Sequence, residues 1–159
     1  MDCAEPALYF TRGGATNRIS SKLAAMLQSE GFTKIPLRLN SDRHPVVDCS
    51  IDGVPSTVAV DTGSQATLVD KSIGIKAAIT MNESTTRCGG YAGDSAQMSV
   101  GRVKKIAIGN FQINDADIWF IDSKRADYPF TGLLGIAELA ANSAIIDVRG
   151  LSMYLRHPQ

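Results

Sequence analysis

One acidic side chain, Asp61, follows directly after a short apolar run. The run 58–60, Val-Ala-Val, is typical of a buried strand, and residues 61–64, Asp-Thr-Gly-Ser, are typical of a tight turn that ends it. A carboxylate held at the end of a strand can serve as a general acid or a general base. The Asp-Thr-Gly sequence occurs only once, so each molecule offers one such group.

A second motif, Gly132-Leu133-Leu134-Gly135, lies about seventy residues after this turn. Each motif alone has a plain structural explanation, because Asp, Thr and Gly all favour turns and two leucines between glycines suit a buried strand. The order and separation of the two motifs favour a catalytic pair of elements.

The elements expected around these motifs are mostly strands. Ile35, Leu37 and Leu39 alternate as in a strand, and a second strand beginning at Val46 turns at Asp52-Gly53 into the strand before Asp61. Further strands are predicted over 96–108 and 111–121, joined at Gly109-Asn110, and over 144–148 and 151–155. We interpret 82–87 as a turn or loop and expect Trp119 in the core.

Two helices are predicted. Thr16 or Asn17 can cap an amphipathic helix that Gly31 ends, and a short helix is expected within 135–144. We therefore divide the chain into an N-terminal extension with a helix, residues 1–34, and a single domain, residues 35–159.

Composition excludes several classes of function. The 159 residues carry 16 basic and 16 acidic side chains, so no net charge draws the chain to nucleic acid or an anionic membrane. Cys3, Cys49 and Cys88 lie far apart, and only two histidines are present, which argues against a metal site, a redox pair or a histidine triad. We expect no metal and no cofactor.

The sequence leaves the compartment open. No apolar run approaches the roughly 18 residues of a membrane span, so we expect a soluble protein with no membrane span. The first residues lack the basic start and apolar middle of a signal peptide. Export, for example to the periplasm with a signal sequence absent from this chain, is an alternative.

From about residue 35 to 156, the order of strand, Asp-Thr-Gly-Ser turn, glycine-rich hairpin, strand pair, Leu-Leu-Gly, helix and closing strand resembles the retropepsin-like aspartic proteases. The run from Gly132 to Leu155 is more similar to the bacterial and cellular branch than to the viral enzymes. The resemblance implies a mostly β, half-barrel acid protease fold with one short C-terminal helix.

The resemblance also implies a role for each residue of the turn. Asp61 would be the catalytic carboxylate, and Thr62 would bond across to its twin in a second copy. Gly63 would let the backbone close under the two carboxylates. Ser64 stands where viral enzymes usually have Ala, and its hydroxyl is expected to bond the outer oxygen of Asp61.

Substrate-binding residues are implied in two segments. Cys88, Gly89, Gly90, Tyr91, Ala92 and Gly93 fall where the family has its flap, the hairpin tip that closes over a peptide. Leu133, Leu134 and Gly135 would pass behind the turn and line apolar pockets. Ile136 replaces the Arg that viral enzymes place after this Gly, so an ion pair of the viral dimer is missing.

The implied activity is that of an aspartic endopeptidase, a hydrolase that cuts polypeptides. Two Asp61 carboxylates at the two-fold axis of a homodimer would share one proton and activate a water. Residues 151–155, where Leu151, Met153 and Leu155 alternate with Ser152 and Tyr154, suit a strand that interleaves with a twin.

Two questions stay open at this point. Residues 1–34 either strengthen the dimer or cover its interface and keep the chain inactive. The alternative to a protease is a catalytically silent retropepsin-like module for dimerisation or peptide binding.

Overall fold

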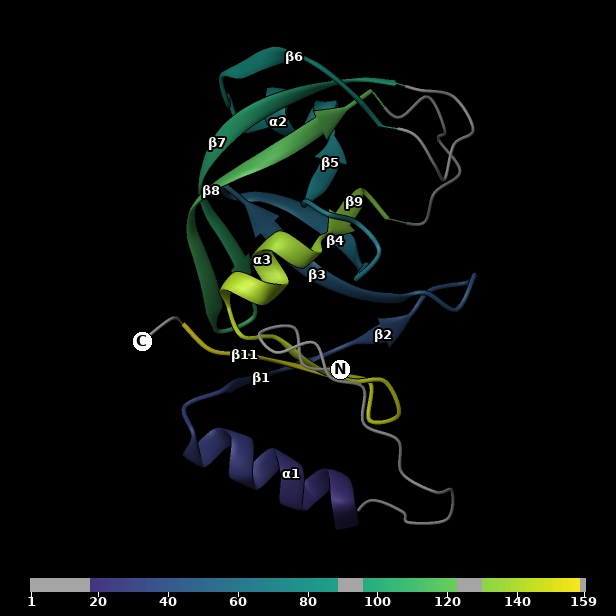
Figure 1. Ribbon diagram of the computed structural model, residues 1–159, viewed down its shortest axis with the longest axis vertical. Helices are drawn as coiled ribbons and strands as arrows, with labels where there is room; N and C mark the ends of the chain where they lie inside the picture. The colour runs from purple at the N-terminus through teal and green to yellow at the C-terminus, as the bar shows by residue number, and fades with distance from the viewer. Residues whose placement is uncertain (1–17, 89–95, 123–129, 158–159) are drawn as a thin grey trace.

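The computed structural model describes residues 18–88, 96–122 and 130–157, which form two sheets and three helices (Figure 1). In chain order the elements are α1 (Arg18–Ser29), β1 (Thr33–Pro36), β2 (Arg38–Leu39), β3 (Pro45–Ile51), β4 (Val54–Val60), β5 (Leu68–Asp70), α2 (Lys71–Lys76), β6 (Met81–Cys88), β7 (Ala96–Ile108), β8 (Phe111–Ile121), β9 (Gly132–Leu134), α3 (Ile136–Ala141), β10 (Ile145–Asp147) and β11 (Ser152–Leu155). The mostly β class expected from the sequence is confirmed.

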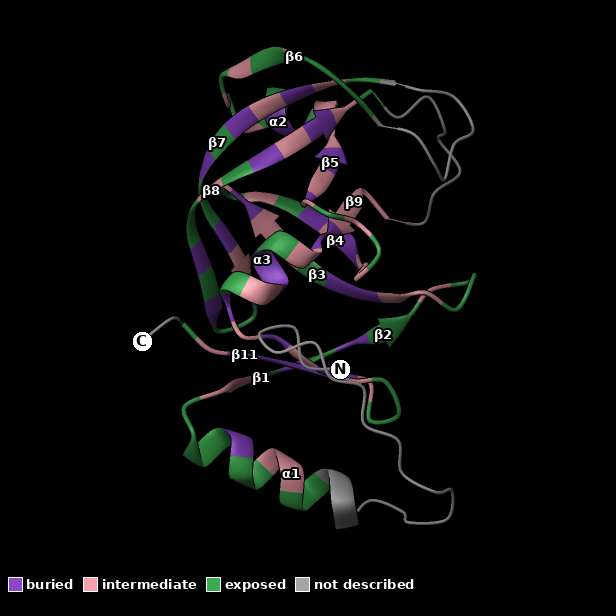
Figure 2. Cartoon of the chain, viewed as in Figure 1, coloured by how far each residue is buried: buried purple, intermediate pink, exposed green. Residues whose placement is uncertain are grey.

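The larger sheet has eight strands in the order β2-β3-β4-β9-β5-β8-β7-β6. Strand β3 also pairs with β7, so the sheet curls back on itself and encloses a core. Figure 2 shows how buried residues alternate with exposed or half-buried ones along much of β8, as expected for a strand with one face in this core. Val58, Val69 and Phe120 lie on that inner face and are at most 2% exposed.

Both predicted hairpins are confirmed. Asp52 and Gly53 connect β3 and β4 with φ values of 44° and 87°, the left-handed angles that a two-residue hairpin turn requires. Gly109, with φ of 56°, begins the turn between β7 and β8, and these two strands have the predicted bounds. The turn at Asp52 and Gly53 sets the pairing of β3 with β4, the strand that leads to Asp61.

Two predictions in the same sheet are wrong. Residues 82–87 belong to strand β6 and are not a loop. Trp119 is half-buried and faces away from the core, because its neighbours Ile118 and Phe120 occupy the inner face. The strand expected over 35–39 is divided between the two sheets, with Ile35 in β1 and Leu39 in the short edge strand β2, where it is 42% exposed. The strand β5 and the helix α2 were not predicted.

The smaller sheet has three strands, with β11 in the middle between β1 and β10. Met153 pairs with Ile35 of β1 on one side and with Ile146 of β10 on the other. All four residues of β11 are buried. Both edges of β11 are therefore occupied within one chain, which contradicts the expectation that this strand interleaves with a twin.

The N-terminal helix α1 lies along the smaller sheet (Figure 1) and ends as predicted. Gly31, with φ of 83°, donates its N–H to Gln28, and Phe32 donates to Leu27, which closes the helix in a Schellman motif. Leu27 is 3% exposed. None of the helices in the described residues has the length and hydropathy of a membrane-crossing segment.

Arg156, which follows β11, contacts the turn that ends α1. The guanidinium of Arg156 lies 4.4 Å from the centre of the Phe32 ring and donates to the Glu30 carbonyl at 3.3 Å. Thr33 and Lys34 pair with Leu155 and Tyr154, so the sheet begins before residue 35. The division into an extension, 1–34, and a domain, 35–159, stays a prediction.

Candidate active site

Asp61 follows the last residue of β4 and begins the predicted turn. Its main-chain N–H donates to the Leu134 carbonyl at 3.0 Å, and its side-chain Oδ1 accepts the N–H of Gly63 at 2.8 Å. A Cβ on Gly63 would lie 3.2 Å from that oxygen, so glycine leaves room for the carboxylate. Backbone and side chain of Asp61 are thus both fixed by hydrogen bonds.

Strand β9 lies between β4 and β5 and brings the two sequence motifs together. It runs parallel to β4, with Leu133 beside Ala59, and antiparallel to β5, with Leu133 beside Leu68. A Cβ on Gly132 would lie 2.7 Å from the Val69 side chain, and one on Gly135 would overlap the backbone of Ala66. Both glycines are needed because the segment 132–135 crosses the segment 66–69 in direct contact.

The N-terminus of α3 holds the far side of the turn. Ile136 donates its N–H to the Ser64 carbonyl at 2.8 Å, and Ala137 donates to the Gln65 carbonyl at 3.3 Å. The first N–H groups of a helix have no acceptor within the helix, so the turn supplies the acceptors they need. The turn and the helix therefore stabilise each other.

The expected hydrogen bond from the Ser64 hydroxyl to Asp61 is not found. It donates to the Ala66 carbonyl at 2.8 Å, and not to Asp61, because the chain bends back toward it within two residues. Thr62 is half-buried at the tip of the turn. Its bond to a twin stays a prediction.

The sequence did not indicate a buried polar contact behind the turn. Glu138 of α3 accepts hydrogen bonds from the N–H of Thr67, at 3.1 Å, and from the Thr67 hydroxyl. Glu138 is 9% exposed and Thr67 is 2% exposed. The one available signal was an acidic residue in the first turn of a predicted helix, which normally faces solvent.

The leucines of the second motif separate onto the two faces of the sheet. Leu134 is 1% exposed and belongs to the core, whereas Leu133 is half-buried on the opposite face. Leu68 pairs with Leu133 and with Trp119, so these three side chains share that face. Leu68 and Trp119 were missed as candidate binding residues, because only strand pairing places them beside Leu133.

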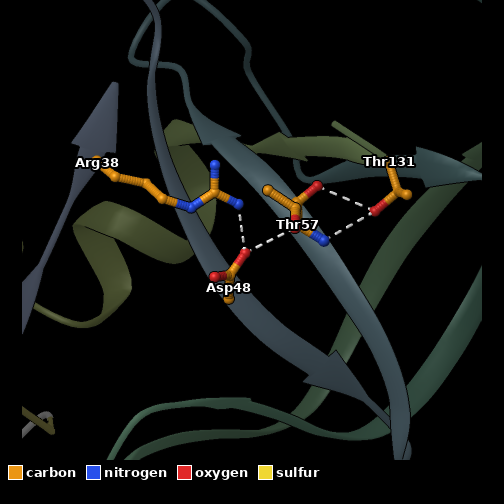
Figure 3. A network of polar contacts seen from close by, with 4 residues as sticks. All are labelled: Arg38, Asp48, Thr57 and Thr131. Atoms are coloured by element: carbon orange, nitrogen blue, oxygen red, sulfur yellow. Dashed lines mark hydrogen bonds and ion pairs between the residues drawn. The ribbon is translucent and has the colours of Figure 1, made fainter. Parts of the chain in front are cut away.

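A polar network fastens the start of β9 to β4 (Figure 3). Thr131 and Thr57 exchange main-chain and side-chain hydrogen bonds of 2.7 to 3.1 Å. The Thr57 hydroxyl also donates to Asp48, which accepts a further bond from Arg38 at 2.7 Å. The Arg38 and Thr57 hydrogen bonds hold the pKa of the Asp48 carboxyl below its ordinary value.

Most of the predicted flap lies outside the described residues. This applies to Gly89, Gly90, Tyr91, Ala92 and Gly93. Cys88 is the last residue of β6, where its backbone pairs with Ala96 at the start of β7. The two strands that lead to the predicted tip are therefore paired.

The described residues contain no cluster of three or more His, Cys, Asp or Glu side chains that could hold a metal ion. His157 stacks on Phe111 with ring centres 4.3 Å apart, and His44 packs edge-on against Phe130. Each histidine thus contacts an aromatic ring.

Cys49 has the properties of an inert structural thiol. It is half-buried in β3, and burial, with a smaller contribution from Asp48, raises its pKa to about 12. We expect iodoacetamide at pH 8 to alkylate it on the order of a thousand-fold more slowly than an ordinary cysteine, because the thiolate is the reactive form. A chain with Cys3 and Cys88 replaced by Ser isolates this measurement, and fast labelling of the folded chain would contradict it.

The central part of the sequence matches a known protein family. Residues 47–137 match a family model described as "Aspartyl protease", a segment from β3 into α3 that covers more than half of the 159 residues. No curated protein sequence matches the chain.

Solved structures with a similar fold include three proteases or protease-like domains. A retropepsin-like aspartic protease from Rickettsia conorii superposes with a TM-score of 0.56 at 16% identity, covering 79% of this chain and 90% of that one. EIAV protease, complexed with the inhibitor HBY-793, gives 0.50 at 19% identity over 64% and 90% of the two chains. The retroviral protease-like domain of Ddi1 from Leishmania major gives 0.50 at 16% identity over 73% and 94%.

Proposed function

Since the chain belongs to the aspartyl protease family and has a retropepsin-like fold, we propose that it is an aspartic endopeptidase completed by a second copy of itself. The observation that carries the proposal is the geometry of Asp61. Its carboxylate is held by Gly63 at the end of β4, and its backbone is held by Leu134. A side chain fixed in this way is preorganised for general acid–base catalysis.

The proposed chemistry uses one proton shared between two carboxylates. Asp61 and its twin would lie about 3 Å apart, where both cannot ionise comfortably. The ionised member takes a proton from water, which attacks the scissile carbonyl. The protonated member donates a hydrogen bond to the carbonyl oxygen.

The proposed substrate is an extended polypeptide with apolar side chains beside the cleaved bond. Leu133, Leu68 and Trp119 form a half-buried apolar face that begins next to the strand carrying Asp61. Apolar side chains on such a face can line pockets for substrate residues. Leu134 keeps a supporting role in the core, and the glycines and Tyr91 of 89–93 are proposed to close over the peptide as a flap.

The proposed homodimer must differ from the viral arrangement. Strand β11 has both edges occupied, so a twin cannot insert a strand beside it. In the described part of the chain, the outer edges of the smaller sheet lie on β1 and β10, where another chain could extend the sheet. The occupied edges of β11 also keep a second candidate function open. If no dimer forms, the chain would be a catalytically silent module.

The experiment is cleavage of a mixed peptide library from about pH 4 to 7 at several protein concentrations. We expect the rate to rise faster than linearly with concentration in the range where dimers form, because two chains make one site. Sedimentation in the same concentration range gives the fraction of dimer. A strict monomer without cleavage would support the silent module, whereas cleavage strictly proportional to concentration, with no dimer, would refute the two-chain site.

A further inference from the structure

A buried carboxylate outside the proposed chemistry lies behind the catalytic turn. Oε2 of Glu138 accepts both the N–H and the hydroxyl of Thr67, and both residues are at least nine-tenths buried. Burying a carboxylate is unfavourable unless it is hydrogen-bonded, so these contacts belong together. The pair connects α3 to the segment that follows the turn.

Hydrogen bonds continue from this pair to Asp61. The Thr67 hydroxyl accepts the N–H of Gly135 at 3.1 Å. That N–H shares one peptide unit with the carbonyl of Leu134, which accepts the N–H of Asp61 at 3.0 Å. An unbroken relay thus runs from the Glu138 carboxylate through Thr67 and the peptide between Leu134 and Gly135 to the backbone of Asp61.

We propose that Glu138 is a positioning residue for Asp61 and acts through Thr67. Its consequence for catalysis rests on the proposed protease function. The peptide between Leu134 and Gly135 is bound on both sides, so it cannot rotate without losing its bond to Thr67 or to Asp61. Hydrogen bonds in such a chain polarise one another, and a catalytic group must be held within about 0.5 Å of its working place.

The first test measures hydrogen exchange of the Asp61 amide by NMR, with no substrate. Thr67→Val removes the hydroxyl at similar volume, and Glu138→Gln replaces the charged acceptor with an amide. We expect exchange at Asp61 to become faster by on the order of tenfold in Thr67→Val, because the bond held by the relay opens more often. Glu138→Gln should accelerate it by a smaller factor, because the amide oxygen still accepts both Thr67 bonds but more weakly than a carboxylate. Thr67→Ser keeps the hydroxyl and is expected to exchange at nearly the native rate.

The controls separate positioning from general loss of stability. The amide of Ile106, a core residue of β7, reports global opening, and faster exchange confined to Asp61 and Gly135 supports the relay. Asp48→Asn is the control for Glu138→Gln, because it makes the same acid-to-amide change in a carboxylate that accepts a hydrogen bond from the Thr57 hydroxyl. It should leave exchange at Asp61 at the native rate. Native exchange at Asp61 in Thr67→Val, or equal acceleration at Ile106, would overturn the proposal.

The second test compares steady-state kinetics of the same variants. We expect Thr67→Val to lower kcat by about ten- to a hundred-fold with KM changed little, Glu138→Gln to lower kcat less because its amide oxygen still accepts the Thr67 bonds, and Thr67→Ser to stay near the native kcat. A loss confined to KM would overturn positioning of Asp61. If the native protein cleaves nothing, the proposed function fails, and the exchange measurement still decides whether Glu138 positions Asp61.

Discussion

Asp61→Asn is expected to reduce peptide cleavage by about a thousand-fold or more, since an amide can neither take a proton from water nor share one with a twin. The variant keeps the size of the side chain and an oxygen that can accept the Gly63 N–H, so its fold should be unchanged. The measurement is kcat/KM on a peptide that the native protein cleaves, with the unfolding temperature measured in parallel.

Two controls make this result specific. Asp115→Asn makes the same change at an exposed site in β8, where φ is 52° and Asn is well tolerated, and should leave activity unchanged. Added to the native chain in equal amount, under conditions where chains pair at random, Asp61→Asn should halve the native rate, because about half of the native chains then have an inactive partner. An undiminished rate would argue for a site within one chain.

Gly135→Ala is expected to lower the free energy of unfolding by about 3 kcal/mol or more and to abolish cleavage. The new methyl group would overlap the carbonyl group of Ala66 and lie 2.8 Å from the Thr67 nitrogen. The contacted atoms are backbone, so they cannot turn aside as a flexible side chain would. Urea unfolding measures the change in stability.

Gly109→Ala is the matched control for this substitution. A Cβ at Gly109 would meet no atom within 4 Å, but φ is 56°, so only backbone strain is added. We expect a loss of about 1 kcal/mol with full activity. At Gly135 φ is −89°, which any residue adopts, so the crossing itself accounts for the glycine. A Gly135→Ala chain as stable as Gly109→Ala would contradict the close crossing.

The sequence predicts those parts of the fold that local chemistry determines. Positive backbone angles at Asp52, Gly53 and Gly109 follow from turn-forming residues, so the hairpins could be placed. Strand β6 could not be predicted in this way. Among the described residues it is an edge strand of the larger sheet and pairs with β7 alone, so its polar residues need not be buried.

The candidate site also has a part that the sequence predicts and a part that it does not. Asp61 and the glycine-bounded leucines are recognisable because their residue types serve the turn and the crossing directly. The contact between Thr67 and Glu138 joins residues 71 positions apart, and the face shared by Leu68 and Trp119 depends on which strands are neighbours. Neither arrangement leaves a local pattern in the chain.

The three-stranded sheet, whose strands all come from one chain, separates folding from association. Many obligate dimers have no stable folded monomer, because their terminal strands find partners only in the other chain. Here β1, β10 and β11 complete one another, so a newly made chain can reach its final fold alone. Such a chain would hold half of a catalytic site in latent form. If the proposed dimer forms the site, the onset of proteolysis would be set by the encounter between finished molecules.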